Sequence, residues 1–321
     1  MQTKPKGKIM KKAVLLIVLL CVAIFSVFVI KYRQSTRLTM IQTVVQNNLD
    51  NAVTKYKAEN AIGILIESKT GKIIVKYETS SKNAIFNQKY EFGALTGLMN
   101  TAIALENDIP IDKTYDNKTV KEIALETINS GYYKMVADLP ESAQSKFFDK
   151  IHFNDVLTVN SEKTVKPDLP TEWTKSEREK ASLGYGVKIT PIHLIAGINA
   201  IINDGIYVFQ NQRSERVISS KTSTAICEIM RETVQTTFID KSADINQKVG
   251  IKTASIETKD PEKIITAVFA TFPIEKPEYS LLVILDNPHA TEYTNGWKTA
   301  SVNAVPLTGQ ILTEIMPILK K

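Results

Sequence analysis

The sequence predicts an α+β fold, with a central antiparallel sheet, terminal helices on one face and a helical lobe beside it. One N-terminal transmembrane helix precedes this fold. Two observations support the prediction. Strand-like segments are grouped at both ends of a helical middle section instead of alternating with helices, which is typical of α+β proteins. Near the N-terminus, Ala13–Ile30 is an uncharged apolar run, long enough as a helix to cross about 30 Å of hydrocarbon.

The charge of the chain is concentrated around this apolar run. The net charge is +6 over 321 residues, but residues 1–37 hold eight basic residues and no acidic one, and the remainder holds 32 basic and 34 acidic residues. The basic balance therefore does not indicate nucleic-acid binding. Five lysines precede the run and three basic residues follow it, so the positive-inside rule places the N-terminus in the cytoplasm. We expect a cytoplasmic tail (1–12), an anchor (13–30), a short stalk helix (31–57) and one folded domain (58–321).

The few cysteines and histidines indicate neither a disulfide nor a metal site. Cys21 lies inside the apolar run and Cys227 in the folded part, so the two cannot pair. The three histidines are far apart and lack metal-ligand spacing. We expect no metal and no cofactor.

The predicted elements follow one another in a simple order. The stalk carries apolar residues at helical intervals, and a hairpin turning at Gly71 comes next. The predicted strands are Ala61–Glu67, Ile73–Tyr77, 248–257, 265–273 and 278–287. The predicted helices are 94–107, 119–128 with a capping box from Thr119 to Glu122, 190–204 with Pro191 at its first position, 219–234 and a C-terminal helix near Leu307–Leu319. Residues 138–180 are predicted to be a variable loop with little regular structure.

Four ordered segments resemble the transpeptidase domain of penicillin-binding proteins, in particular the monofunctional, membrane-anchored class B type. SLGYGVKITPIHLIAGINAIINDG (182–205) is similar to the family's Ser-Ile-Gly-Tyr-Gly segment, Thr-Pro and following helix. YEFGALTG (90–97) stands where the family has Tyr-Glu-Pro-Gly-Ser-Thr-Phe-Lys. GIKTASIE (250–257) stands at the Lys-Thr-Gly strand, and EYSLLVILDNP (278–288) at the penultimate strand. The resemblance implies a bacterial cytoplasmic-membrane protein of peptidoglycan synthesis or cell division, with its main domain outside the cytoplasm.

The same resemblance implies that the family's active site is degenerate here. The family forms a serine ester, with a serine opening a helix and a lysine three residues later as its base. Ala94 stands at the serine position and Gly97 at the lysine position. Thr127-Ile128-Asn129 is the best match to Ser-x-Asn, and Lys252-Thr253-Ala254 to Lys-Thr-Gly. The usual proline is replaced by Phe92, and the family's long pedestal domain is replaced by the short stretch 31–57.

Because Ala94 has no nucleophilic oxygen, we expect a non-catalytic protein that acts as a scaffold or regulator. Its partners would be other cell-wall synthesis or division proteins, bound through the anchor helix and the domain surface. Two alternatives stay open: an active D,D-transpeptidase or carboxypeptidase with an unrecognised nucleophile, and a non-covalent sensor of peptidoglycan stem peptides. For a sensor, the candidate ligand contacts are Thr127, Asn129, Lys252, Thr253 and Ser255. The resemblance further predicts that Ala94, Thr127, Asn129 and Lys252 converge on one cleft, with Asn129 on a loop.

Overall fold

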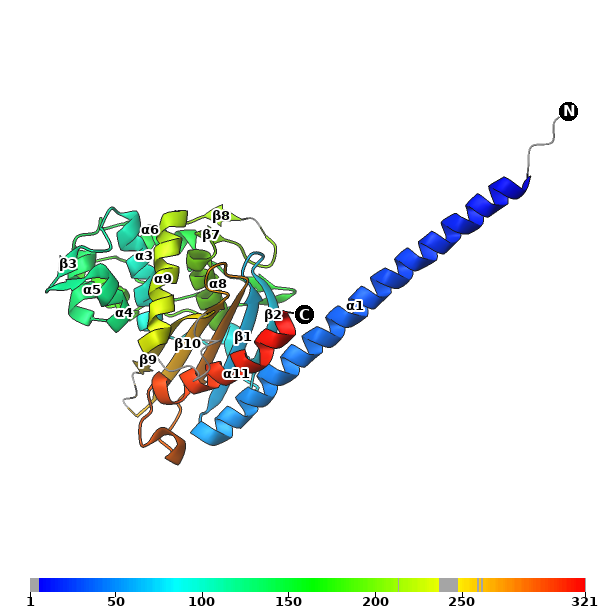
Figure 1. Cartoon of the computed structure of the whole chain (residues 1–321). Helices are drawn as coiled ribbons and strands as arrows, with labels where there is room; N and C mark the ends of the chain where they lie inside the picture. The colour runs from blue at the N-terminus through cyan, green and yellow to red at the C-terminus, as the bar shows by residue number, and fades with distance from the viewer. Residues whose placement is uncertain (1–5, 213, 237–247, 259, 261, 321) are drawn as a thin grey trace.

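The structure is a computed structural model that describes residues 6–212, 214–236, 248–258, 260 and 262–320, with the side chains of 6–18 and 30 left out. It consists of one long helix that extends from a mixed domain (Figure 1). In the domain, a five-stranded sheet lies between the terminal helices and a helical lobe.

The central sheet is antiparallel throughout and has the order β2-β1-β11-β10-β9. All five predicted strands are confirmed. Their bounds are β1 Asn60–Glu67, β2 Lys72–Glu78, β9 Gly250–Glu257, β10 Ile264–Phe272 and β11 Tyr279–Asp286. Strands from opposite ends of the chain are neighbours, because β11 pairs with β1 from Asn60–Asp286 to Glu67–Tyr279.

Alternating side chains divide the sheet into two faces, as the two-residue period of a strand requires. Ile62, Ile64 and Ile66 of β1 join the core shared with the helical lobe. Ala61 and Leu65 of the same strand join a second core beneath the terminal helices. The sheet is thus buried on both sides, and each side has its own hydrophobic core.

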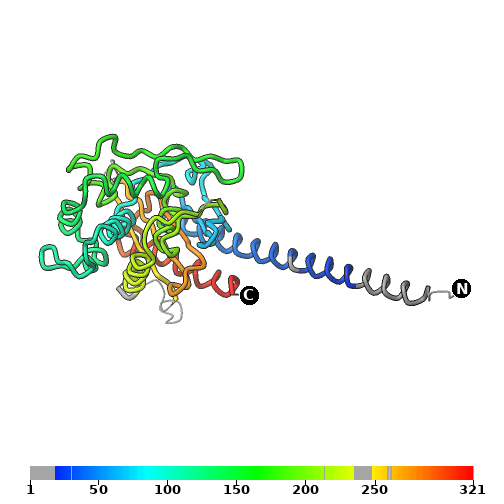
Figure 2. The backbone as a smooth tube through the Cα atoms, turned by 90° about the horizontal axis from the view of Figure 1, so that it is seen from above, coloured from blue at the N-terminus to red at the C-terminus, as the bar shows by residue number. Residues whose placement is uncertain are grey.

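The long N-terminal helix α1 (Lys6–Tyr56) runs without interruption from the apolar run into the domain. The predicted stalk is helical, but its second half is not a free spacer. Ile41, Val45, Leu49 and Ala52 are all at most 2% exposed and belong to the core beneath the sheet. There α1 lies beside the C-terminal helix α11 (Ala304–Leu319) in both views (Figures 1 and 2). The core of the domain therefore includes α1 from Ile41 on, which precedes the expected boundary at residue 58.

The helical lobe is built on the opposite face of the sheet. The predicted helices appear as α3 (Ala94–Glu106), α4 (Val120–Glu126), α8 (Pro191–Ile202) and α9 (Ser220–Thr236). The capping box from Thr119 to Glu122 is present. The prediction of a variable loop with little regular structure over 138–180 is wrong, because this region holds α6 (Ala143–Lys150) and the greater part of α7 (Lys175–Ser182). The remaining elements are α2 (Ala84–Asn87), α5 (Asn129–Ala137), the 3-10 helices η1 (Glu292–Thr294) and η2 (Ala300–Val302), and the short strands β3 (Thr114–Tyr115), β4 (Lys118–Thr119), β5 (Thr158–Val159), β6 (Glu162–Lys163), β7 (Ile206–Tyr207) and β8 (Glu215–Arg216).

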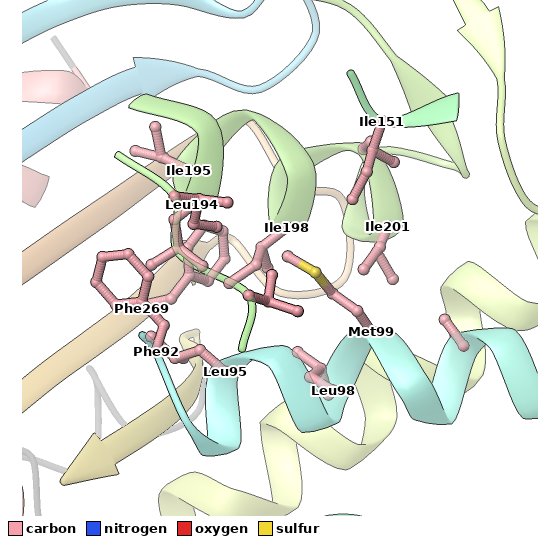
Figure 3. Packing of buried hydrophobic residues seen from close by; sticks show 14 of the residues in the cluster. Phe92, Leu95, Leu98, Met99, Ile151, Leu194, Ile195, Ile198, Ile201 and Phe269 are labelled. Carbon is pink, nitrogen blue, oxygen red and sulfur yellow. The ribbon is translucent and has the colours of Figure 1, made fainter. Parts of the chain in front are cut away.

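The buried central helix α3 packs against α8 through apolar side chains. Figure 3 shows Met99 of α3 directed toward Ile198 and Ile201 of α8. Phe92, which stands just before α3, is fully buried in the same core. This packing fixes where α3 begins and therefore where Ala94 lies.

Candidate active site

Helix α3 begins at Ala94, as predicted, and its start lies close to strand β9. The N-cap residue Gly93 has φ 49°, a conformation that favours glycine. A Cβ built on Gly93 would lie 2.9 Å from Ile256 Cγ1 and 4.0 Å from the Cβ of Ala254. The structure therefore brings the position of the family's serine next to the strand that carries the third motif.

A second glycine closes this corner from the other side. Gly184 has φ 82°, and a Cβ built on it would lie 2.6 to 2.8 Å from backbone atoms of Gly93. Nearby, the carboxylate of Glu91 accepts a hydrogen bond of 2.9 Å from the Gly186 N–H. The segment 182–186 is thus packed directly on the start of α3. This close approach explains the glycines at positions 93 and 184.

The space beside Gly97 is occupied by Tyr132 of helix α5. A Cβ built on Gly97 would lie 3.1 Å from both Cζ and the hydroxyl oxygen of Tyr132. Tyr132 is 0% exposed, and its hydroxyl lies 3.3 Å from that of Thr101, which donates to the Gly97 carbonyl. Burial raises the pKa of Tyr132 to about 12, so its hydroxyl stays protonated at neutral pH. An aromatic ring fills the place that the resemblance assigns to the base.

Lys252 is buried and not a surface cation. Its side chain leaves β9 toward the helical lobe, is 2% exposed, and donates to the Ala124 carbonyl at 2.5 Å and to the Thr127 hydroxyl at 3.0 Å. Ala124 belongs to the last turn of α4, whose terminal carbonyls have no partner within the helix. A cation at a helix C-terminus is stabilised by the helix dipole. Burial lowers the pKa of Lys252 to about 8.

Thr127 and Asn129 do not have the same environment. Thr127 is the C-cap of α4 and has φ 55°, a strained conformation for a β-branched residue. Asn129 is exposed and is the first residue of α5, so the prediction that it stands on a loop is wrong. The chain reverses between two helices here because Thr127 adopts a left-handed conformation that ends α4. Within the segment Thr127-Ile128-Asn129, it is Thr127 that forms a hydrogen bond with Lys252.

Thr253 and Ser255 lie on the other face of β9. Alternation places them opposite Lys252, Ala254 and Ile256. The Ser255 hydroxyl accepts a 2.9 Å hydrogen bond from the Ala300 N–H in η2, on the side of the terminal helices. The ligand contacts expected of Thr253 and Ser255 stay a prediction. The strand places both residues on the face opposite Lys252, whereas Ala254 faces the start of α3.

A buried polar network behind α3 was not predicted from the sequence. Gln144 donates to Asn100 Oδ1 at 2.8 Å and to the Arg178 carbonyl at 3.0 Å, and Asn100 donates to the Ala181 carbonyl at 3.2 Å. The Arg178 guanidinium donates to the carbonyls of Val136 and Leu139. Gln144 and Arg178 lie in the region that we predicted to be a loop, and no local pattern links them to Asn100. Within the described chain, no group of three or more His, Cys, Asp or Glu is arranged to hold a metal ion.

Comparison with known proteins assigns the family. The family described as "Penicillin binding protein transpeptidase domain" matches residues 106–307. The chain belongs to this family. The matched span includes Thr127, Tyr132 and Lys252, whereas Ala94 and Gly97 precede it.

Individual relatives and structures agree with this assignment. The chain is 23% identical to "Probable peptidoglycan D,D-transpeptidase FtsI" of Caulobacter vibrioides, over 87% of this chain and 57% of that protein. It is 22% identical to "Stage V sporulation protein D" of Bacillus subtilis, over 87% of this chain and 52% of that protein. It therefore spans about half the length of these relatives. The transpeptidase domain of penicillin-binding protein 3 from Burkholderia pseudomallei has the same fold, with a TM-score of 0.77, 18% identity, and coverage of 88% of this chain and 95% of that one.

Proposed function

We propose that this penicillin-binding-protein family member is a membrane-anchored, non-catalytic scaffold or regulator of peptidoglycan synthesis or division. One observation carries the proposal. The position of the nucleophile is Ala94, and the space of the base beside Gly97 is filled by the ring of Tyr132. A serine ester cannot form without the oxygen, and loss of a nucleophile costs several orders of magnitude in rate. The neighbouring Thr96 is fully buried and does not replace it.

The anchor part of the proposal rests on α1. Among the described residues, one helix (Leu19–Tyr56) is long and apolar enough to cross a membrane. The large apolar side chains between Leu19 and Phe28 are each 53 to 67% exposed. We assign this segment to a single span with the N-terminus in the cytoplasm, and its lipid-exposed surface, with the domain surface, to contacts with other cell-wall synthesis or division proteins.

Intact-mass measurement tests the loss of chemistry. The full chain, kept in detergent micelles, is incubated with benzylpenicillin beside a relative that retains serine and lysine at the two positions. We expect an adduct of one drug molecule on the relative and no mass change on this chain. An adduct of one drug molecule on this chain would overturn the non-catalytic assignment.

A second candidate, an active acyltransferase with another nucleophile, is favoured by the contact of 3.0 Å between Lys252 Nζ and Thr127 Oγ1. A hydroxyl beside a lysine whose pKa is lowered to about 8 resembles an activated pair. The same lysine, however, also donates to the Ala124 carbonyl at the end of α4, so its amino group is not directed at Thr127 alone. If a penicillin adduct forms, its loss in Thr127→Val identifies this pair, while Ser130→Ala serves as a control at a nearby exposed hydroxyl.

The scaffold role requires a separate test. Cross-linking of the full chain in its host membrane should capture cell-wall synthesis or division proteins. Replacing the exposed residues of the span by leucine, with the length unchanged, should reduce that capture without changing the folding of the domain. Capture that depends on neither the span nor the domain surface would contradict the role.

A further inference from the structure

The loop between β11 and α11, residues 288–299, presents two large aromatic side chains to solvent. We call it the aromatic loop. Tyr293 is 61% exposed and Trp297 is 65% exposed. Outside α1, these are the two most exposed large hydrophobic side chains in the described part of the domain. Neither ring contributes to a core, so the fold itself does not explain their presence.

The aromatic loop is fixed by its own hydrogen bonds. The Thr291 N–H donates to the Thr294 hydroxyl at 2.9 Å, and that hydroxyl donates back to the Thr291 carbonyl at 3.1 Å. The backbone N–H of Trp297 donates to the Thr294 carbonyl at 3.0 Å, and the backbone N–H of His289 donates to the Tyr56 carbonyl at 2.8 Å. The loop is therefore tied to itself and to the end of α1. Two exposed rings on an ordered loop bind a ligand with little loss of conformational entropy.

Beside Tyr293 the surface is hollowed by about 770 Å³, and every lining residue apart from Tyr293 has a side chain that ends in a polar or charged group. The lining comprises Asn51, Thr54, Lys55, Lys57, Thr291, Glu292 and Tyr293. The ammonium group of Lys55 lies 5.4 Å from the centre of the Tyr293 ring, which helps to hold the ring in place. The hollow thus combines amide, hydroxyl and charged groups with one aromatic ring and contains no aliphatic residue.

This combination selects among classes of ligand. The centre of a protein interface is enriched in apolar residues and depleted in charged ones, unlike this lining. A lipid surface is excluded by position, because the aromatic loop lies by the end of α1 that is remote from the N-terminal apolar run (Figure 1). A sugar has hydroxyl groups around its edge and a face of C–H groups that packs against the negative face of an aromatic ring. The polar groups of the hollow would contact the hydroxyl groups of a sugar, and the aromatic rings would contact its C–H face.

We propose that the aromatic loop and the polar hollow bind a glycan chain, with Tyr293 and Trp297 stacking on sugar rings. The choice of sugar rests on the proposed function, which makes the N-acetylated hexosamine chain of peptidoglycan the ligand. Because the loop lies at the end of the domain remote from the anchor, binding would hold the domain between membrane and wall. This site is separate from Ala94 and Lys252 and needs no acyl transfer.

Titration of the full chain with tetra-N-acetylchitotetraose tests the proposal. The protein is kept in a detergent without a sugar headgroup, and binding is measured by ligand-observed saturation-transfer NMR and by the fluorescence of Trp297 above the background of Trp173. We expect saturable binding in the millimolar range or tighter, with a blue shift of the emission. The proposal would be overturned if no saturable binding were seen up to about 10 mM. A dissociation constant of 10 mM corresponds to a binding free energy of about −2.7 kcal/mol.

Matched variants locate the binding site. Tyr293→Ala and Trp297→Ala should each weaken binding about tenfold, as expected for aromatic anchors. Tyr185→Ala removes a ring that is 43% exposed elsewhere on the domain and should leave binding unchanged. Binding that persists in the double variant Tyr293→Ala/Trp297→Ala would overturn the assignment to this loop. The penicillin measurement is independent of this result, so failure of the glycan site is distinguishable from failure of the non-catalytic assignment.

Discussion

The ring of Tyr132 lies where a side chain at position 97 would be, 3.1 Å from the Cβ that Gly97 lacks. Tyr132 belongs to α5 and Gly97 to α3, and both are buried. A glycine inside a helix costs about 1 kcal/mol relative to alanine. Here the glycine is explained by packing, because it admits Tyr132, the largest fully buried side chain among the described residues.

We predict that Gly97→Lys destabilises the protein by about 3 kcal/mol, because the new side chain overlaps the Tyr132 ring. Tyr132→Ala alone should cost about 3–5 kcal/mol through loss of a buried ring. In the double variant the two losses should not add, since the cavity receives the lysine, and a coupling of at least about 1 kcal/mol is expected. Urea unfolding monitored by circular dichroism measures all three, and strict additivity would show that the two positions do not compete for space.

Restoring the two motif residues should not restore acylation. From the sequence alone, Ala94→Ser with Gly97→Lys is expected to regain weak acylation at most, because Ala254 and Phe92 also depart from the family's pattern. Because Tyr132 fills the space of the lysine, we expect no labelling of this double variant by fluorescent penicillin. Ala94→Ser alone is the control for the serine. A labelled band with the double variant, absent from the wild type, would mean that Tyr132 moves aside readily.

The sequence predicted the sheet and the start of α3 because these depend on local patterns. Alternation of Ile62, Ile64 and Ile66 identifies a strand without knowledge of its partners, and the segment from Tyr90 to Gly97 marks the start of a helix. The packing of the Tyr132 ring beside Gly97 could not be predicted in this way. Its partner Tyr132 lies on another helix, and no periodic pattern links the two. The burial of Lys252 was missed for the same reason, since its partners Ala124 and Thr127 belong to α4 and its C-cap.

Lys252 should make stability depend on pH. Its pKa falls from 10.5 to about 8 on folding because the ammonium is desolvated. The folded chain therefore releases this proton at lower pH than the unfolded chain, so stability rises as pH increases from about 8. Relative to Lys252→Met, the wild type should gain up to about 1.4 kcal/mol between pH 8 and 9. Urea midpoints of both proteins across this range provide the comparison, and parallel pH profiles would contradict the buried ammonium.

Gly184→Ala should be strongly destabilising. The residue has φ 82°, and its added Cβ would meet backbone atoms of Gly93 at 2.6 to 2.8 Å. Backbone cannot give way as a flexible side chain can, so we expect a loss of about 2–4 kcal/mol. Gly296→Ala is a matched control, because it shares φ 82° but has no atom within 4 Å of the added Cβ. A similar small loss in both variants would mean that only the backbone conformation matters and that segment 182–186 is not pressed on α3.

The domain needs the second half of α1 for its stability. A spacer between membrane and domain would be dispensable, but Leu49 is 0% exposed, and a Cβ on Gly63 of β1 would lie 2.8 Å from its Cδ1. Leu49→Ala should therefore cost about 2–5 kcal/mol in the full chain, whereas Met40→Ala, at a side chain that is 51% exposed, should change stability by less than about 0.5 kcal/mol. A fragment of residues 58–321 would expose one apolar face of the sheet and should aggregate, while residues 37–321 should unfold cooperatively in urea. Equal cooperative unfolding of both fragments would return α1 to the role of a simple stalk.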